Sequence, residues 1–380
     1  MTAPVDRTRE AQKRVLALGP LPPFVGGAAK NTAIICNALE MRGAQVTRLP
    51  TNKTRTRAEH SRSLGFLSDR TTGFLSNIRR VIMTPKDWDD TTVYLVPDGG
   101  FGVAFSAAYA RAAVSRFSRL VVHHRSYNHI RRRSRLMALL MNTAPATTVH
   151  VFLDPVMEQR FKAVYSADVT SLYVPNAATC DVALLPPETR TATHNTINIG
   201  FLSNLVEDKG FDVVAESFPI LAERLGPSAR FLLAGRPVGD VNAERLAALQ
   251  QTLGDRLEYF GEVAGVAKTE FFHACDVFVF PTRFAQEAQP NVLYEAMAGG
   301  AAIVSTRWAG IPWILEGAVS RIIESGTCCN DLVAAVIDIV SSGDLRTARP
   351  RQRAAFLSKK SDADKRYAQL IDVLTGKATY

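Results

Sequence analysis

The sequence predicts an α/β fold with two domains, each built on a doubly wound parallel sheet. Short runs of apolar and β-branched residues alternate along the chain with longer amphipathic stretches, a rhythm typical of βαβ units. The chain has 380 residues, which is more than one hydrophobic core usually serves. The alternation stops over residues 178–195, a stretch rich in Pro, Thr and Ala, and then starts again.

The pattern in the first half of the sequence indicates one parallel sheet. Its expected strands are 14–18, 45–49, 93–96, 120–123, 148–152 and 170–174. Its expected helices are 28–41, 104–117 and 155–165. Residues 51–90 show no clear period, and their polar, basic start predicts a loop.

The second half predicts the other sheet. Its expected strands are 197–202, 230–234, 257–260, 277–280 and 302–305. Its expected helices are 209–224, 243–253, 268–274, 292–298, 332–341 and 351–374. We therefore expect an N-terminal domain over 1–180, a C-terminal domain over 181–350, and C-terminal helices over 351–380 that pack back toward the first domain.

The composition favours anionic partners. Lys and Arg number 45 against 36 Asp and Glu, a formal charge of +9, which suits nucleotide phosphates, acidic lipids or nucleic acid. Nucleic acid is disfavoured because no aromatic platform accompanies the charges. Arg131–Arg135 precedes the apolar stretch 136–141, which indicates either contact with anionic lipid or a helix with a solvated basic end.

The sequence also predicts a location. The N-terminus lacks the apolar core of a signal peptide, and no apolar run is long enough to span a bilayer. Five scattered cysteines, an odd number without a CxxC pair, favour a reducing compartment. We expect a cytoplasmic protein, with peripheral contact at the inner face of the membrane left open.

Two carboxylates form the strongest motif. Glu287 lies in the loop after strand 277–280, and Glu295 lies in the first turns of the next helix, which Pro290 can open. Carboxylates accept hydrogen bonds from sugar or ribose hydroxyls, and a helix N-terminus favours anions. The alternative is a capping Glu and a solvated helix Glu, which this spacing often produces by chance.

The surrounding residues make this motif more specific. With Asp276–Pro281 before it and Glu295–Ala298 at its end, the segment resembles the Glu-x7-Glu element of glycosyltransferase family 4. That family has the GT-B fold, two facing Rossmann-like domains with a cleft between them. The resemblance implies that Glu287 is catalytic and faces the donor sugar, that Glu295 holds the nucleotide ribose, and that the donor site includes Asn291 and Val292.

A second element resembles the family's diphosphate-binding turn. It runs from Gly200 to Lys209, where the family commonly has an Arg and a Lys five residues apart. Lys209 matches the Lys, which implies a catalytic and donor-binding role, but Asn204 takes the Arg position. An amide donates a hydrogen bond without bringing charge, so either the phosphates are held less tightly or Arg283 or another base contributes.

The N-terminal half resembles the family more loosely. Gly26 and Gly27 match the glycine loop beside the donor phosphates. A catalytic histidine near the donor sugar is implied at His123 or His124, of which His124 is preferred because it is nearer the loop. The alternative is that neither histidine takes part in catalysis, one being buried and the other exposed. Acceptor contacts are expected at three positions that end strands, namely Asp98, Arg125 and Tyr127, although Asp98 could instead form an Asx-turn.

Smaller matches complete the pattern. Gly235 lies where the family turns toward the nucleotide, and the backbone of Val263 lies where it meets the base. Residues 174–177 resemble the family's Pro-Asn element. Besides Asn204, three further positions depart from the family. Trp313 stands for the usual Glu, and Ala288-Gln289 stands for Gly-Phe, a change expected to alter sugar contacts and donor choice.

The resemblance implies a retaining, metal-independent glycosyltransferase. It would move a sugar from a nucleotide-sugar donor to a hydroxyl of a saccharide, glycolipid or other small acceptor. No cofactor and no metal ligands are expected, since no Asp-x-Asp motif occurs where a metal-dependent transferase needs one. The alternatives are a sugar-nucleotide epimerase or a phosphorylase of GT-B fold, and a catalytically silent GT-B scaffold, which the departures at Asn204 and Trp313 keep open.

Overall fold

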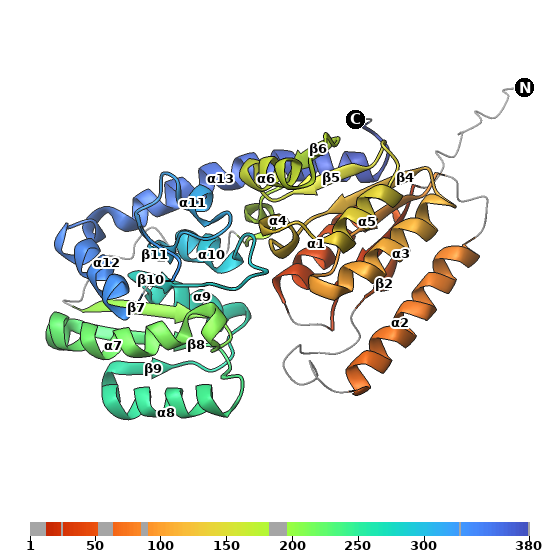
Figure 1. Cartoon of the computed structure of the whole chain (residues 1–380). Coiled ribbons are helices and arrows are strands. Elements are labelled where there is room, and N and C mark those ends of the chain that lie inside the picture. Colours follow the sequence, from red (N-terminus) through yellow and green to blue (C-terminus); the bar gives the residue numbers. More distant parts are fainter. Residues whose placement is uncertain are drawn as a thin grey trace, which may run out of the picture. The chain divides into compact units, whose positions relative to one another are not determined.

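The computed structural model describes residues 13–23, 26–51, 64–84, 90–181, 196–326 and 328–378. The chain divides into two compact units, an N-terminal unit (Met1–Val174 with Lys365–Tyr380) and a C-terminal unit (Pro175–Asp364). Each unit contains a six-stranded parallel sheet with helices packed around it (Figure 1). The predicted fold class is therefore confirmed. Most of the predicted linker, and residues 24–25 of the glycine loop, lie outside the described residues.

The sheet of the N-terminal unit has the order β2-β1-β3-β4-β5-β6. Its strands are β1 Arg14–Gly19, β2 Gln45–Pro50, β3 Thr92–Leu95, β4 Arg119–His123, β5 Val149–Phe152 and β6 Ser171–Tyr173. Its helices are α1 Gly27–Met41, α2 Leu64–Met83, α3 Val103–Val114, α4 Asn128–Arg131, α5 Arg135–Thr143 and α6 Pro155–Tyr165. The strand order reverses between β1 and β3, and ligands of such sheets bind beyond the carboxyl ends of the strands at this point.

Helix α2 occupies a segment in which the sequence shows no clear period. It runs over Leu64–Met83 and packs against α3, where the ring of Phe74 lies 4.9 Å from that of Phe105 and 5.1 Å from that of Tyr109. Its Ser, Thr and Gly residues are weak helix formers, so tertiary packing rather than propensity maintains it. This helix was not predicted from the sequence, and the polar, basic start for which a loop is predicted lies largely at 52–63, outside the described residues.

Helix α5 follows the basic segment Arg131–Arg135. The hydroxyl of Ser134 caps it by accepting a hydrogen bond from the Met137 amide, 3.3 Å away. Met137 and Leu140 are fully buried, whereas Leu139 is exposed. A helix with a basic end and a core face is therefore present at this position.

The sheet of the C-terminal unit has the order β12-β11-β10-β7-β8-β9. Its strands are β7 Ile197–Leu202, β8 Ala229–Ala234, β9 Leu257–Tyr259, β10 Val277–Phe280, β11 Ala302–Thr306 and β12 Ser320–Ile323. Its helices are α7 Phe211–Leu225, α8 Asp240–Leu253, α9 Gly265–Ala274, α10 Asn291–Gly299, α11 Ile311–Leu315, α12 Cys329–Ser341 and the first part of α13 Leu345–Leu374. The sequence predicted all of these except β12 and α11.

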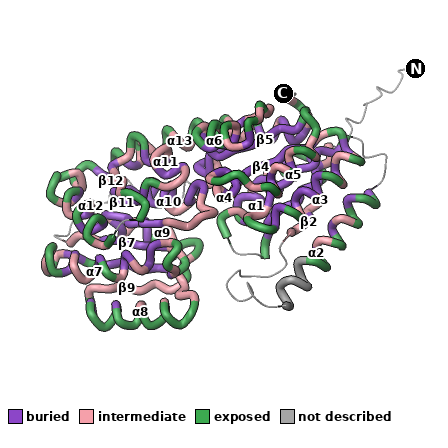
Figure 2. Tube along the Cα trace, in the orientation of Figure 1, coloured by how far each residue is buried: buried purple, intermediate pink, exposed green. Residues whose placement is uncertain are grey.

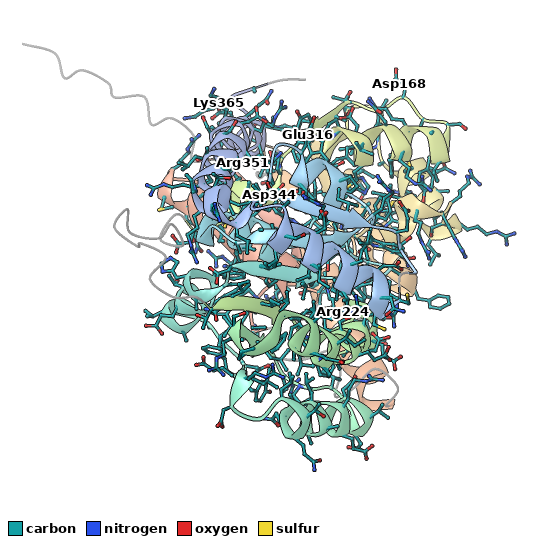
Figure 3. The ribbon with its side chains drawn as sticks, turned by 90° about the vertical axis from the view of Figure 1, so that its left-hand side faces the viewer. Asp168, Arg224, Glu316, Asp344, Arg351 and Lys365 are labelled. Carbon is teal, nitrogen blue, oxygen red and sulfur yellow. The ribbon has the colours of Figure 1, made fainter. Side chains whose placement is uncertain are left out.

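Burial follows the layers of each unit. The strands are mostly buried and the outer faces of the helices are exposed (Figure 2). At the surface, charges pair locally: a carboxylate of Asp344 lies 3.0 Å from Arg321 and 3.3 Å from Arg351 at the start of α13 (Figure 3). Such exposed pairs stabilise a fold only slightly, so the apolar core decides the stability of each unit.

One buried polar side chain attaches α13 to the C-terminal sheet. Gln352 is fully buried, and its Nε2 donates to the carbonyl oxygens of Ala301 (2.6 Å) and Val319 (3.0 Å). Its Oε1 accepts from the Val319 amide, 3.1 Å away. The side chain thereby satisfies backbone groups next to β11 and β12 that would otherwise be buried without partners.

We expect Gln352→Leu to lower the unfolding free energy of the C-terminal unit by roughly 3 kcal/mol, because buried backbone groups lose their partners. Urea unfolding followed by circular dichroism measures the change. The control is Gln251→Leu, at an exposed position of α8, which should leave the midpoint nearly unchanged. Equal midpoints for the two variants would contradict this role of Gln352.

Candidate functional site

The predicted residues of the C-terminal unit lie at the carboxyl edge of its sheet. Asn204 and Lys209 follow β7, Gly235 follows β8, Val263 follows β9, and Glu287 follows β10. Asn291, Val292 and Glu295 are on α10, the helix after that loop. Because the strands are parallel, all these loops leave the sheet on one side, where α/β proteins bind ligands.

An ion pair joins two of these loops. The ammonium of Lys209 contacts Oε2 of Glu287, and the two side chains are only 20% and 14% exposed. The ammonium also lies 4.5 Å from the centroid of the Phe284 ring, which favours a cation. The structure thus brings together a base and an acid that lie 78 residues apart in the sequence.

Backbone contacts explain why these loops meet. Gly210 has a φ of +84°, and a Cβ at this position would overlap the carbonyl oxygen of Pro281. The carbonyl oxygen of Asp208 accepts hydrogen bonds from the Arg283 amide (2.9 Å) and the Thr282 hydroxyl (3.3 Å). Only glycine allows this approach, so Gly210 fixes the position of Lys209 against the β10 loop.

The turn next to Asn204 carries Arg236, a base other than the Arg283 suggested by the sequence. Asn204 is exposed, and the next residue, Leu205, donates its amide hydrogen to the Arg236 carbonyl, 2.9 Å away. Arg283, the base suggested by the sequence, lies 2.6 Å from a carboxylate oxygen of Asp212. Arg236 was not among the predicted residues, and its position directly after Gly235 was the available signal.

Glu295 is paired with a lysine that was not predicted from the sequence either. Glu295 is 3% exposed, and Nζ of Lys268 lies 2.7 Å from its Oε2. Lys268 lies in the first turns of α9, the helix that follows β9, and its side chain is 23% exposed. The pair neutralises a carboxylate whose burial would otherwise be costly.

The strand-end turns around Gly235 are tightly packed. Gly235 has a φ of +127°, and a Cβ there would overlap the Ser203 carbonyl oxygen. Its amide donates to the Gly261 carbonyl at 2.7 Å, and its carbonyl accepts from the Tyr259 hydroxyl at 2.8 Å. Val263, two residues beyond Gly261, is half-buried. These contacts hold the turns after β7, β8 and β9 together.

Two residues that depart from the family pattern, Gln289 and Trp313, make hydrogen bonds to nearby residues. Oε1 of Gln289 accepts from the Asn176 amide (3.1 Å) and the Tyr294 hydroxyl (3.2 Å), and the side chain is nearly fully buried. Nζ of Lys359 donates to the carbonyl of Trp313 at 3.2 Å and lies 5.3 Å from its ring centroid. Both residues make contacts that hold the C-terminal unit together.

The predicted residues of the N-terminal unit lie at the carboxyl edge of its own sheet. Gly26 and Gly27 are exposed at the start of α1. Asp98 follows β3; its amide donates to the Ser106 hydroxyl at 3.1 Å, and its carboxylate accepts from Thr51 at 3.4 Å. Arg125 and Tyr127 follow β4 and are half-buried.

Both predicted histidines are fully buried. Nδ1 of His123 lies 2.7 Å from the Tyr94 hydroxyl. Nε2 of His124 lies 2.9 Å from Nδ1 of His150, and Nδ1 of His124 lies 3.2 Å from Nε2 of His129. No three His, Cys, Asp or Glu residues in the described part of the chain are arranged to hold a metal ion.

Burial decides the protonation of this cluster. It lowers the pKa of His129 and of His150 to about 4. Burial, and then the neighbouring imidazoles, hold the pKa of His124 well below its usual range. Burial and then Arg125 do the same for the pKa of His123. At neutral pH these side chains are therefore uncharged.

Part of the chain matches a protein family. Residues 196–342 match the family described as glycosyl transferases group 1. A GDP-mannose-dependent alpha-(1-6)-phosphatidylinositol monomannoside mannosyltransferase of Mycobacterium tuberculosis is 22% identical over 252 residues, 63% of this chain and 64% of the relative. A phosphatidylinositol N-acetylglucosaminyltransferase subunit of Arabidopsis thaliana is 29% identical over 44% of this chain and 36% of the relative. The matches therefore span less than two thirds of the length of these relatives.

Solved structures match over nearly the whole chain. A sucrose-phosphate synthase from Thermosynechococcus elongatus superposes with a TM-score of 0.72 and 16% identity, covering 96% of this chain and 100% of that one. Anabaena HepE in complex with UDP and glucose superposes with a TM-score of 0.66 and 13% identity, covering 95% and 100%. These structures are GT-B glycosyltransferases, and the likeness establishes the GT-B fold. Among the described residues, no helix has both the length and the hydropathy needed to cross a membrane.

We expect the unfolding free energy to fall as the pH drops from about 6.5 to 4. The buried histidines stay neutral in the folded protein while the unfolded chain takes up protons, at about 1.4 kcal/mol per pH unit for each group. Chemical unfolding at several pH values measures this slope. His150→Phe should make it shallower, whereas Phe152→Leu, which loses packing on His124, should keep it. Equal slopes in wild type and His150→Phe would contradict the assignment.

We expect Lys268→Met to destabilise the C-terminal unit by about 3 kcal/mol, since it leaves the buried charge of Glu295 without its partner. Adding Glu295→Gln should recover much of the loss. Urea unfolding of the two single variants and the double variant completes a double-mutant cycle. Strictly additive losses would contradict direct coupling between the two side chains.

Proposed function

We propose that the chain is a retaining, metal-independent glycosyltransferase, because residues 196–342 match the glycosyl transferases group 1 family. It transfers a sugar from a nucleotide-sugar donor to a hydroxyl of a saccharide, glycolipid or other small acceptor. The observation that carries the proposal is the Lys209–Glu287 pair at the carboxyl edge of the C-terminal sheet. A cation is needed there because the leaving nucleoside diphosphate gains negative charge as the glycosidic bond breaks.

Lys209 exchanges partners when the donor binds. Without donor its ammonium is held by Glu287. A bound diphosphate offers more charge and more acceptor oxygens than one carboxylate, so it takes over the ammonium. Glu287 is then free to accept hydrogen bonds from the hydroxyls of the donor sugar. One event thereby prepares both the phosphate contact and the sugar contact.

Arg236 supplies the second positive charge. Its backbone lies beside Leu205, next to the Asn204 position where related enzymes carry an Arg. The side chain is 37% exposed, and its Nε lies 3.6 Å from a carboxylate oxygen of Glu262, a loose pair that a phosphate can replace. Asn204 then adds a neutral hydrogen bond.

Further groups in the C-terminal unit hold the rest of the donor. Glu295 accepts hydrogen bonds from the ribose, and Lys268 keeps this buried carboxylate compensated. Asn291 and Val292 present the amides of the α10 N-terminus, which favour an anion. Gly235 and the backbone of Val263 receive the base. HepE was solved with UDP and glucose, which supports a nucleotide-sugar as donor.

The N-terminal unit binds the acceptor. Asp98, Arg125 and Tyr127 contact it, and the glycine loop with Gly26 and Gly27 has backbone amides suited to a phosphate. His124 is fully buried and both of its ring nitrogens are bonded to other imidazoles, so it acts through these neighbours and not on the donor sugar itself. The reaction needs no cofactor and no metal. The acceptor oxygen bonds to the anomeric carbon from the face that the diphosphate leaves, its proton passes to the departing diphosphate, and no covalent enzyme intermediate forms.

A lipid-linked acceptor fits the surface of this unit. Two relatives carry phosphatidylinositol in their names. Arg131–Arg135 and the exposed Leu139 provide positive charge and apolar surface for an anionic membrane. The proposed location is the cytoplasm, with peripheral contact at the inner face of the membrane.

We expect Glu287→Gln to lower turnover at least about 100-fold, since a neutral amide no longer complements the donor sugar or orients Lys209. Transfer and donor hydrolysis are measured with a panel of UDP- and GDP-sugars. Glu223→Gln, at an exposed position of α7, is the matched control and should keep wild-type activity. Circular dichroism confirms that both variants are folded.

The same assays separate the alternatives. Wild-type turnover in folded Glu287→Gln would overturn the assignment of the site. Conversion of the donor without any acceptor would indicate an epimerase, and release of sugar 1-phosphate from a glycan would indicate a phosphorylase. A wild-type protein that neither binds nor consumes any donor would be a scaffold.

A further inference from the structure

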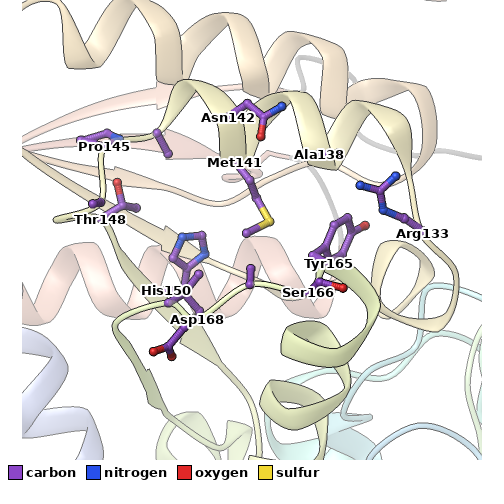
Figure 4. A pocket seen from close by; sticks show the side chains of 14 residues that line it. Arg133, Ala138, Met141, Asn142, Pro145, Thr148, His150, Tyr165, Ser166 and Asp168 are labelled. Carbon is purple, nitrogen blue, oxygen red and sulfur yellow. The ribbon is translucent and has the colours of Figure 1, made fainter.

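The N-terminal unit contains a cavity at the edge of its sheet opposite to Asp98 and Arg125. It has a volume of about 360 Å³ and lies between α5, the segment before β5 and the turn between α6 and β6. Met141 from α5 and His150 from β5 point toward one another across it (Figure 4). This volume is within the range of small-molecule sites. The cavity lies at the amino ends of β5 and β6, away from the carboxyl edge where the substrates are proposed to bind.

Two nearly buried polar side chains in this cavity have capacity for a ligand. Thr148 is 2% exposed, and its hydroxyl has no hydrogen-bond partner among the described residues. His150 is 3% exposed; its Nδ1 bonds to His124, while its Nε2 has no partner in the described part of the chain. A buried polar atom without a partner costs roughly 1–3 kcal/mol. A ligand that bonds to the Thr148 hydroxyl recovers that cost and gains a further bond at Nε2 of His150.

The charges at the rim indicate the class of ligand. Arg133 is exposed and lines both this cavity and a second hollow beside Gly100, and it belongs to the arginine-rich segment Arg131–Arg135. Asp168 lines the other side of the cavity and is also exposed. Its carboxylate can accept hydrogen bonds from hydroxyls, but it repels a second anion placed beside it. A molecule with one oxyanion and several hydroxyls satisfies both sides.

The cavity is connected to the other edge of the sheet by three imidazoles. His150, His124 and His129 form a hydrogen-bonded chain with nitrogen–nitrogen distances of 2.9 and 3.2 Å. His129 also lines the second hollow, of about 260 Å³, together with Gly100, Asn128 and Arg132, residues that follow β3 and β4. Its Nδ1 is buried and has no partner among the described residues.

The chain of neutral imidazoles has two settings, because each ring carries one proton. In one setting His150 donates to His124 and His124 donates to His129, which leaves Nε2 of His150 as an acceptor. In the other setting every donation runs in the opposite direction, and Nε2 of His150 donates into the cavity. An oxyanion that accepts from His150 selects the second setting, and Nδ1 of His129 then becomes an acceptor at the far end.

We propose that the cavity is an effector site for a small hydroxylated oxyanion, of the size of one sugar phosphate, and that its binding sets the direction of hydrogen bonding along the three imidazoles. Arg133 and Nε2 of His150 hold the oxyanion, while Thr148 and Asp168 hold its hydroxyls. The effector thereby controls whether Nδ1 of His129 donates or accepts a hydrogen bond beside the second hollow. The binding step is independent of the proposed transferase activity.

Isothermal titration of the full chain tests the binding step. The probes are glucose 6-phosphate, inorganic phosphate and uncharged glucose. Glucose 6-phosphate should bind more tightly than inorganic phosphate, and glucose should not bind; equal binding of the two phosphates would show that hydroxyls play no part. His150→Phe and Arg133→Ala should each weaken glucose 6-phosphate at least about tenfold, the loss of one charge-assisted contact. Arg135→Ala, an exposed arginine outside the cavity lining, is the control.

Thr148→Val separates a binding role from a structural one. It removes a hydroxyl that has no partner among the described residues of the free protein, so it should raise the melting temperature while it weakens glucose 6-phosphate. Imidazole nitrogen NMR of the wild type should show a changed protonation pattern at His129 when the ligand is added. Absence of binding, binding that none of the cavity variants weakens, or an unchanged His129 signal would overturn the proposal.

Discussion

The structure of the candidate donor site depends on one close approach, between the turn after β7 and the loop after β10. Gly210 allows it, since any side chain would strike the Pro281 carbonyl. The approach brings Lys209 onto Glu287 and over the Phe284 ring. Partial burial strengthens this attraction but also makes each charge dependent on the other. A ligand that takes one partner must therefore compensate the second, and a sugar diphosphate has the hydroxyls and the negative charge to compensate both.

Each unit uses buried polar groups differently. In the C-terminal unit, charged groups are paired between different elements, as Lys268 of α9 and Glu295 of α10 are, so that ligands compete for existing partners. In the N-terminal unit, neutral imidazoles form a chain whose ends have no partner among the described residues. Paired charges suit the recognition of a charged donor. A chain of neutral imidazoles can instead relay whether its far nitrogen donates or accepts a hydrogen bond, because reversing the direction of the hydrogen bonds moves no net charge.

Much of the fold could be predicted because parallel strands between helices are short apolar runs, as β7 and β10 are. Helix α2 could not, because its Ser, Thr and Gly residues carry little helical signal and its contacts with Phe105 and Tyr109 are tertiary. At the site, the spacing of Glu287 and Glu295 was visible in the sequence. Their lysine partners come from elements distant in the sequence, the turn after β7 and helix α9, and a spacing rule cannot predict such pairing. The alternation rule also could not separate His123 from His124, because β4 is buried on both faces.

The proposed donor site works only if Lys209 and Glu287 separate to receive the diphosphate and the sugar of one donor. A crystal structure with a bound nucleotide-sugar tests this separation most directly. We expect a diphosphate oxygen within hydrogen-bond distance of Nζ of Lys209 and a sugar hydroxyl donating to Glu287. A donor bound at another place, with the ammonium still on the carboxylate, would contradict the proposed site.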